Sequence, residues 1–210
     1  MAMIKKNDDS TKQGVWTITS DMNILRKNLL DLFCQLAYRD GDFVLSSGQK
    51  SSYYINGKQV TLHAEGALLI SRLLLSLLPI NTDAVAGLEL GAVPIVSSVS
   101  VISALENRPI PGLIIRKEVK EHGTKAYIEG PTLPSWSRVV VLEDVVTTGK
   151  SAMRAVNHLR DSCYVVDTVI SLIDRKQGGK DLYQSKGLDF FALFDIEEIK
   201  ERYKELENFK

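Results

Sequence analysis

One stretch, Val139 to Ser151, does most to constrain what this chain of 210 residues can fold into. Its first four residues are apolar, which predicts a short buried strand, and a helix is expected to begin near Ser151. Two carboxylates, Glu143 and Asp144, end the strand, and a turn of small, hydroxyl-bearing residues follows them. Because ligands of α/β sheets bind where strands end and helices begin, the stretch predicts a ligand site at a strand's carboxyl end.

The residue types in the turn suit a sugar phosphate. Backbone N–H groups of the turn and of the first helical turn can surround a phosphate, and Thr147, Thr148 and Ser151 add hydroxyl donors. Gly149 allows the backbone to curl. The two carboxylates would repel a phosphate, but they suit the vicinal hydroxyls of a ribose, either directly or through a bound Mg²⁺.

Two other interpretations of this stretch are weaker. Gly149-Lys150-Ser151 ends like a Walker A loop, but the first glycine of such a loop is absent, since Val145 or its neighbours stand there. An ordinary strand–turn–helix with a capping Thr or Ser explains the hydroxyls but not two adjacent carboxylates.

Composition excludes several classes of protein. The 26 Lys and Arg residues balance the 26 Asp and Glu residues, so a general attraction to nucleic acid or to an anionic membrane is not indicated. No apolar run has the length of a membrane span, and Cys34 and Cys163 lack metal-ligand spacing, which favours reduced thiols. We therefore expect a cytoplasmic protein with no nucleic-acid or membrane partner.

The order of elements predicts one domain. Residues 1–19 are expected to form a disordered or appended tail, and 20–210 a single domain with hood elements over about 20–60, a core over about 61–195 and a terminal helix over 196–207. In the hood, Ser20-Asp21 caps a helix that ends before Gly41, and a β-hairpin runs from Phe43 to Asn56-Gly57. The remaining predicted elements are helices over 63–78, 91–105, 151–161 and 196–206, strands over 83–88, 110–115, 138–142, 165–173 and 189–194, and a turn at Gly178-Gly179.

Strands that alternate with helices predict a parallel sheet covered on both faces, an α/β fold. The carboxyl ends of its strands carry polar residues, namely Glu89, Arg116, Glu143-Asp144 and Asp174-Arg175. Arg175 should project over this edge, where its planar guanidinium would suit a carboxylate, although a salt bridge with Asp174 is the alternative.

A second stretch, Arg116 to Lys125, has no periodicity but five groups that can carry positive charge. A long unstructured segment inside a compact domain is typical of a lid or binding loop, and Gly123 and Gly130 offer hinges. Its glutamates offset part of the charge, so a solvated loop is as plausible from these residues alone.

Both stretches resemble one family. The 139–151 stretch is similar to the phosphoribosyl-pyrophosphate (PRPP) signature of type I phosphoribosyltransferases, and Arg-Lys-x-x-Lys-x-His-Gly at 116–123 is similar to the catalytic loop of orotate phosphoribosyltransferases. The likeness extends from about Leu25 to Phe194. It implies the type I phosphoribosyltransferase fold, a central parallel sheet flanked by helices with a small N-terminal β hood, and an Mg²⁺-dependent transfer from PRPP to orotate in pyrimidine biosynthesis.

The resemblance also implies site residues. PRPP would bind Arg116, Lys117, Lys120, His122, Glu143, Asp144, Val145, Val146, Thr147, Thr148, Gly149, Lys150 and Ser151. Lys120, His122 and Asp144 would be catalytic, with Lys120 and His122 reaching into the partner's site of a homodimer. Orotate would contact Thr147, Arg175, Tyr54 and Ile55, although strand packing explains the last two equally well. Mg²⁺ would be held mainly through PRPP, with Asp144 a candidate ligand.

Two positions depart from the family pattern. Some members carry a lysine where Ser46 stands, and others place Tyr-Lys where this chain has Leu90-Gly91. Lys50, Lys58 or a water are the candidates to replace those cations, and the turn at Glu89–Ala92 could offer backbone N–H groups to pyrophosphate.

Two other functions stay open at this stage. A PRPP-binding regulator would keep the signature but should show a basic face, of which the neutral chain gives no sign. A phosphoribosyltransferase for another base would need different base contacts, whereas the lysine-rich loop and Arg175 favour an acidic pyrimidine.

Overall fold

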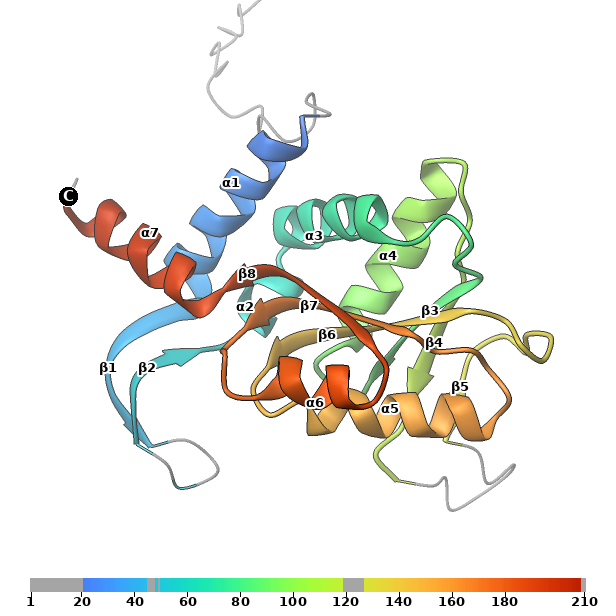
Figure 1. Ribbon diagram of the computed structural model, residues 1–210. Helices are drawn as coiled ribbons and strands as arrows, with labels where there is room; N and C mark the ends of the chain where they lie inside the picture. The colour runs from blue at the N-terminus through green and yellow to red at the C-terminus, as the bar shows by residue number, and fades with distance from the viewer. Residues whose placement is uncertain (1–20, 45–47, 49, 119–126, 209–210) are drawn as a thin grey trace, which may run out of the picture.

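The computed structural model describes residues 21–44, 48, 50–118 and 127–208, and within them it has a six-stranded and a two-stranded sheet (Figure 1). The large sheet has the spatial order β5-β4-β3-β6-β7-β8. Its strands are β3 (Ala84–Leu88), β4 (Gly112–Ile115), β5 (Ile128–Glu129), β6 (Val139–Val146), β7 (Thr168–Asp174) and β8 (Asp189–Asp195). Only β5 runs antiparallel to its neighbour among these, so the predicted parallel sheet is confirmed.

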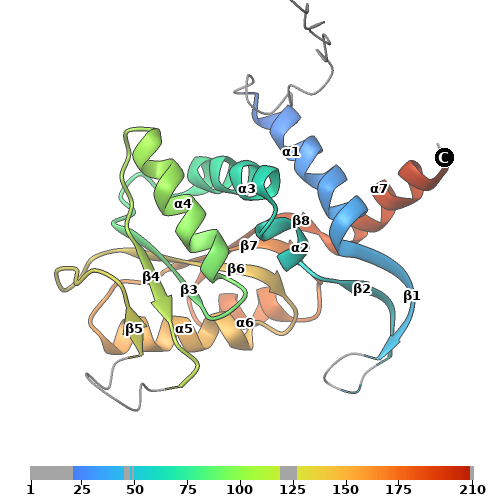
Figure 2. The ribbon, with the colours of Figure 1, turned by 180° about the vertical axis from the view of Figure 1, so that it is seen from behind.

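Helices cover both faces of this sheet (Figures 1 and 2). On one face lie α3 (Ala64–Leu77) and α4 (Val93–Leu105), and on the other lie α5 (Lys150–Asp161) and α6 (Gly179–Ser185). The apolar residues form two buried clusters, one on each side of the sheet. Central strands must then be apolar on both faces, and every residue of β7 is buried.

The hood precedes the sheet in the chain. It consists of α1 (Met22–Leu32), a π-helical turn η2 (Phe33–Ala37), the antiparallel hairpin of β1 (Tyr38–Val44) and β2 (Lys50–Ile55), and the short helix α2 (Lys58–Thr61). As expected, Asp21 caps α1, because its carboxylate accepts the N–H groups of Asn23 and Ile24. The hairpin projects from the side of the sheet (Figure 1).

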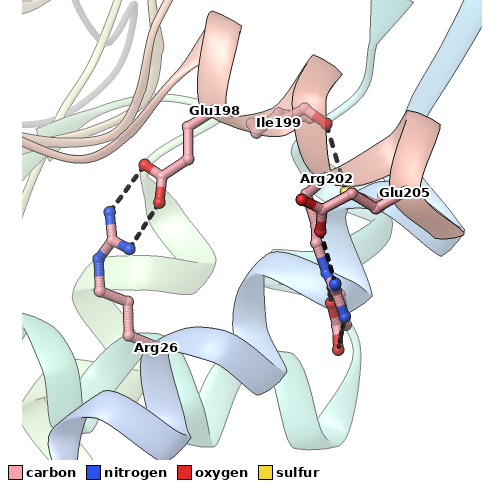
Figure 3. Close-up of polar contacts among 7 residues, drawn as sticks. Arg26, Glu198, Ile199, Arg202 and Glu205 are labelled. Carbon is pink, nitrogen blue, oxygen red and sulfur yellow. Dashed lines mark hydrogen bonds and ion pairs between the residues drawn. The ribbon is translucent and has the colours of Figure 1, made fainter.

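The last helix, α7 (Ile196–Asn208), packs against the first (Figure 3). Arg26 of α1 donates to both carboxylate oxygens of Glu198 at 2.6 and 2.8 Å. Arg202 of α7 bonds in the same way to Asp31 at 2.6 and 3.2 Å. Paired, charge-assisted bonds of this kind fix orientation as well as distance, so α7 holds α1 in a defined place.

Several predicted boundaries were wrong. The first helix ends through η2 at Ala37, because Tyr38 is already extended, and Gly41 lies inside β1 beside a register shift. The predicted hairpin is confirmed, although β1 begins at Tyr38 instead of Phe43 and Asn56-Gly57 leads from the hairpin into α2. Gly178-Gly179 begins α6, since Gly178 adopts a left-handed φ of 93° as the N-cap. The expected tail at 1–19 and Ser46 lie outside the described residues.

Within the described ranges, no helix is both long and apolar enough to cross a bilayer.

Candidate active site

The two acidic residues of the signature belong to β6 itself, which runs four residues further than predicted, to Val146. Successive side chains of a strand point to opposite faces, and the two carboxylates therefore differ in environment. Glu143 is buried, and burial, followed by the charge of Asp144, raises the pKa of its carboxyl group well above the ordinary value. The side chain of Asp144 remains partly accessible to a ligand.

Two glycines approach Asp144 closely. A Cβ atom added to Gly91, in the turn after β3, would lie 2.7 Å from Oδ2 of Asp144. A Cβ on Gly57, before α2, would lie 3.5 Å from the Asp144 Cβ. The turn that replaces the family's Tyr-Lys pair and the end of the hood therefore converge on this carboxylate.

The turn after β6 leads directly into α5, which begins at Lys150, one residue earlier than predicted. Gly149 adopts a left-handed φ of 79° there, a conformation that favours glycine. The first N–H groups of a helix have no partner within the helix, so the turn and the start of α5 present backbone donors next to the hydroxyls of Thr147, Thr148 and Ser151.

The N-terminal end of α6 supports this turn from behind, which the sequence did not indicate. A Cβ added to Gly179 would overlap Cγ1 of Val146 and lie 3.2 Å from the carbonyl oxygen of Thr147. The ring of the fully buried Tyr183 lies 3.0 Å from where Gly149 would carry a Cβ. The turn is therefore closely packed on its inner side, which fixes its backbone.

Only the stem of the basic loop lies within the described residues. The backbone N–H of Arg116 donates to the carbonyl of Tyr127 at 2.8 Å, and its guanidinium lies 3.6 Å from Glu129. The N–H of Lys117 donates to Oε1 of Glu89 at 2.7 Å. Lys120 and His122 lie outside the described residues, so the structure places two of the four predicted loop residues, Arg116 beside β5 and Lys117 beside the end of β3.

Arg175 follows β7 at the same edge of the sheet, as predicted. Its Nε donates to the hydroxyl of Tyr53 at 2.9 Å, and its guanidinium carbon lies 4.8 Å from the centre of the Tyr53 ring. Its Nη2 is buried without a hydrogen-bond partner among the described residues. The alternative salt bridge is not formed, because Asp174 accepts the N–H of Lys176 instead. Nη2 of Arg175 therefore has donor capacity that nothing in the described residues satisfies.

The hairpin residue beside Arg175 is Tyr53, which the sequence did not single out. Tyr54 points to the other side of β2, where its side chain is 43% exposed and packs against Phe43. Ile55 is half-buried against the core. The period-two alternation of β2 indicated that Tyr53 and Tyr54 face opposite ways, but it could not indicate which of them faces the site.

This arrangement defines a class of protein. A parallel sheet with a strand-end carboxylate pair, a phosphate-binding turn before a helix and a hood over the same edge is the architecture of a type I phosphoribosyltransferase. A solved adenine phosphoribosyltransferase from Leishmania donovani shares this fold, with a TM-score of 0.58 at 18% identity over 83% of each chain.

Closer relatives narrow the class. An orotate phosphoribosyltransferase from Nostoc sp. is 66% identical over 206 residues, which cover 98% of this chain and 100% of the relative. One from Synechocystis sp. is 63% identical over 89% of this chain and 94% of its own. The crystal structure of Mycobacterium tuberculosis orotate phosphoribosyltransferase in complex with PRPP matches with a TM-score of 0.71 at 30% identity, over 84% of this chain and 99% of that one. No family model matches the chain. The chain belongs to the orotate phosphoribosyltransferase family, which acts in pyrimidine biosynthesis.

Proposed function

We propose that this enzyme binds PRPP across the ends of β3 and β6 and orotate between Arg175 and the hood, and transfers the phosphoribosyl group to give orotidine 5′-monophosphate and pyrophosphate. The observation that carries the proposal is the unpartnered Nη2 of Arg175 at the edge that holds the signature turn. A guanidinium donor suits the orotate carboxylate, and Tyr53 holds that guanidinium in place.

The phosphate end of PRPP is assigned to residues 147–151. The N–H groups of the turn and of the first turn of α5 would receive the 5′-phosphate, with the hydroxyls of Thr147, Thr148 and Ser151 around it. The ribose hydroxyls would donate to the partly accessible carboxylate of Asp144, whereas Glu143 is buried on the opposite face of β6. Asp144 suits this role because its side chain remains partly accessible although Gly57 and Gly91 pack beside it. Thr147 would also approach orotate, as the family resemblance implies.

The reaction follows from where charge develops. As the bond from ribose C1 to pyrophosphate lengthens, the ribose becomes oxocarbenium-like and pyrophosphate gains negative charge. The anionic ring nitrogen of orotate then forms the new bond to C1, and pyrophosphate leaves with the electron pair. Arg116, Lys117, Lys120 and His122 would stabilise the pyrophosphate side, and no covalent enzyme intermediate is needed.

Mg²⁺ fits this site as an ion carried by the substrate. Within the part of the chain that the structure describes, no cluster of three acidic, histidine or cysteine side chains could hold a metal alone. Mg²⁺ commonly binds through one or two carboxylates and substrate phosphates, so PRPP would supply most ligands and Asp144 one. When bound, the ion would neutralise charge on the pyrophosphate.

We also propose a cytoplasmic homodimer of single-domain subunits, with Lys120 and His122 serving the partner's site. The surface suited to a second copy is the outer side of α4, a helix without a charged residue. Val101 and Leu105 are 62% and 72% exposed there, and Leu90, before the helix, is 66% exposed. Because Leu90 adjoins Gly91, one exposed apolar side chain also lies at the active-site edge. Sedimentation of a Val101→Asp, Leu105→Asp variant tests it, since a dimer of unchanged stability would contradict this interface.

The test of the catalytic proposal is orotate consumption, followed by its ultraviolet absorbance with PRPP and Mg²⁺. Arg175→Ala is expected to raise the KM for orotate, and Lys120→Ala to lower kcat. Mixing the two variants should restore partial activity, because one site of a mixed dimer would hold both residues. If orotate persists while PRPP still binds, the base assignment is wrong.

A further inference from the structure

The peptide groups on both sides of Lys117 are held by charged side chains from two different elements. On one side, Oε1 of Glu89 accepts the Lys117 N–H at 2.7 Å. On the other, Nη2 of Arg154 donates to the Lys117 carbonyl at 2.6 Å. We propose that Glu89 and Arg154 are positioning residues, which fix the direction of the Lys117 side chain and act on the reaction only through it.

Glu89 reaches Lys117 from the end of β3. Its own N–H donates to the carbonyl of Ile115 at 2.8 Å, which extends the β3–β4 pairing by one residue. The Glu89 carboxylate accepts from the N–H of Lys117, two residues beyond Ile115, where β4 ends. A carboxylate that accepts a backbone N–H makes a stronger bond than a neutral acceptor, so this contact is a firm one. It ties Lys117 to the turn in which Gly91 touches Asp144.

Arg154 reaches Lys117 from α5. It lies just over one turn from the start of the helix, on the solvent side, while Ala152 and Ala155 beside it are buried and fix the helix on the sheet. The same helix presents its first N–H groups to the signature turn. Arg154 therefore links the backbone of Lys117 to the element proposed to bind the 5′-phosphate.

Together the two contacts fix the backbone from which the Lys117 ammonium extends at the edge that carries the strand-end carboxylates. The positive charge of Lys117 already acts at this edge, because it lowers the pKa of Glu143 and so offsets part of the rise that burial causes. A lysine side chain has many rotamers, and fixing the backbone that carries it reduces the conformations lost on binding. An ammonium directed in this way would meet PRPP with little reorganisation.

The inference rests on the proposed role of Lys117 in binding PRPP. It differs from a merely structural role, in which Glu89 and Arg154 would stabilise the fold and affect catalysis equally whether or not Lys117 is present. It also differs from direct contact with the substrate, in which their effects would add to that of Lys117. A double-mutant cycle separates these cases, because residues that act through one another are not additive.

The experiment compares kcat/KM for PRPP and the melting temperature of Lys117→Ala, Arg154→Met and Glu89→Ala, and of each of the last two combined with Lys117→Ala. We expect Arg154→Met and Glu89→Ala each to lower kcat/KM about tenfold, mainly through the KM for PRPP, because each loses a hydrogen bond to a charged group. In the Lys117→Ala background, neither should lower it further.

Two further variants serve as a conservative replacement and as a control. Glu89→Gln keeps an acceptor oxygen and should recover most of the activity lost in Glu89→Ala. Arg160→Met is the matched control on the same helix, since Arg160 donates to the carbonyl of Val166 and lies away from the site; it should leave the KM for PRPP unchanged.

Additive losses in the Lys117→Ala background would overturn the positioning role, even with Lys117 essential. A Lys117→Ala enzyme with unchanged kcat/KM would instead overturn the assignment of Lys117 to PRPP, and the inference with it. Unchanged activity in both Arg154→Met and Glu89→Ala would refute the inference alone.

Discussion

Replacing Tyr53 by Phe should weaken orotate binding while leaving PRPP binding intact. The substitution keeps the ring, over which the Arg175 guanidinium lies at 4.8 Å, and removes only the hydroxyl that accepts from Nε at 2.9 Å. Arg175 already has one buried N–H group, on Nη2, without a partner. Loss of the hydroxyl would leave a second donor of the same guanidinium unpaired.

The size of the effect follows from the kind of bond. A hydrogen bond to a charged group contributes about 1.5–3 kcal/mol, and the lower end applies because Arg175 is only half-buried and water can replace part of the contact. About 1.5 kcal/mol corresponds to roughly a tenfold rise in the KM for orotate. The cation–π contact should survive, and the lost bond alone should lower the melting temperature by about 3–6 °C in a chain of this length.

Initial rates at saturating PRPP, with orotate varied, measure this change. Tyr54→Phe is the matched control, since Tyr54 lies on the opposite side of the same strand and should give an unchanged KM. Tyr54→Ala tests the alternative that the family resemblance suggested, a ring that covers the pyrimidine. An unchanged orotate KM in Tyr53→Phe, or a large rise in Tyr54→Ala alone, would refute the reasoning.

Three shorter predictions concern the buried parts of the structure. Because the pKa of Glu143 is raised in the native state, the folded protein keeps a proton that the unfolded chain loses above pH 4.5, and the free energy of unfolding falls as pH rises from 4.5 toward the native pKa. The stability of Glu143→Gln relative to the natural protein should therefore increase as pH rises above 4.5. Urea unfolding at several pH values measures this, and a difference that does not change with pH would contradict it. Burial raises the pKa of Cys34 to about 12, so only the exposed Cys163 should react quickly with a thiol reagent in the native protein, and two fast thiols would be the opposing result. Gly179→Ala should lower the free energy of unfolding by about 1–3 kcal/mol through overpacking, and it should weaken PRPP binding through the signature turn. The control Lys180→Ala, at the exposed next residue, should change neither quantity. Thermal melts and PRPP titrations measure the two effects.

The parts of the fold that the sequence predicted are those with long or repeated patterns. The helix expected over 63–78 is observed over Ala64–Leu77, because its apolar positions repeat for four turns and Pro79 follows. The strand expected over 189–194 is observed over Asp189–Asp195. The turn between β6 and α5 could be predicted because acids, hydroxyls and Gly149 stand together between an apolar strand and a helix.

The parts that escaped prediction are short or depend on contacts across the fold. β5 has two residues and α6 has seven, which is too few for the hydrophobic period of a strand or of a helix to be recognised in the sequence. The contact of Tyr53 with Arg175 joins residues 122 positions apart, and the bonds of Glu89 and Arg154 to Lys117 join side chains to backbone. Backbone N–H and C=O groups have the same chemistry at nearly every position, so a residue pattern cannot predict which of them a side chain will bind.

The packing of α7 against α1 also sets the order in which the enzyme can be completed during its synthesis. Arg26 and Glu198 are 172 residues apart, so α1 leaves the ribosome long before the helix that holds it. The ring of Tyr203 on α7 lies 4.9 Å from that of Tyr38, and the ammonium of Lys200 lies 4.5 Å from that of Tyr53. Domains fold as their segments emerge from the ribosome. A nascent chain that still lacks α7 can therefore form the turn after β6 before the β1–β2 hairpin has its contacts with Lys200 and Tyr203. The half of the site that we propose holds the base is therefore completed only after α7 has been made.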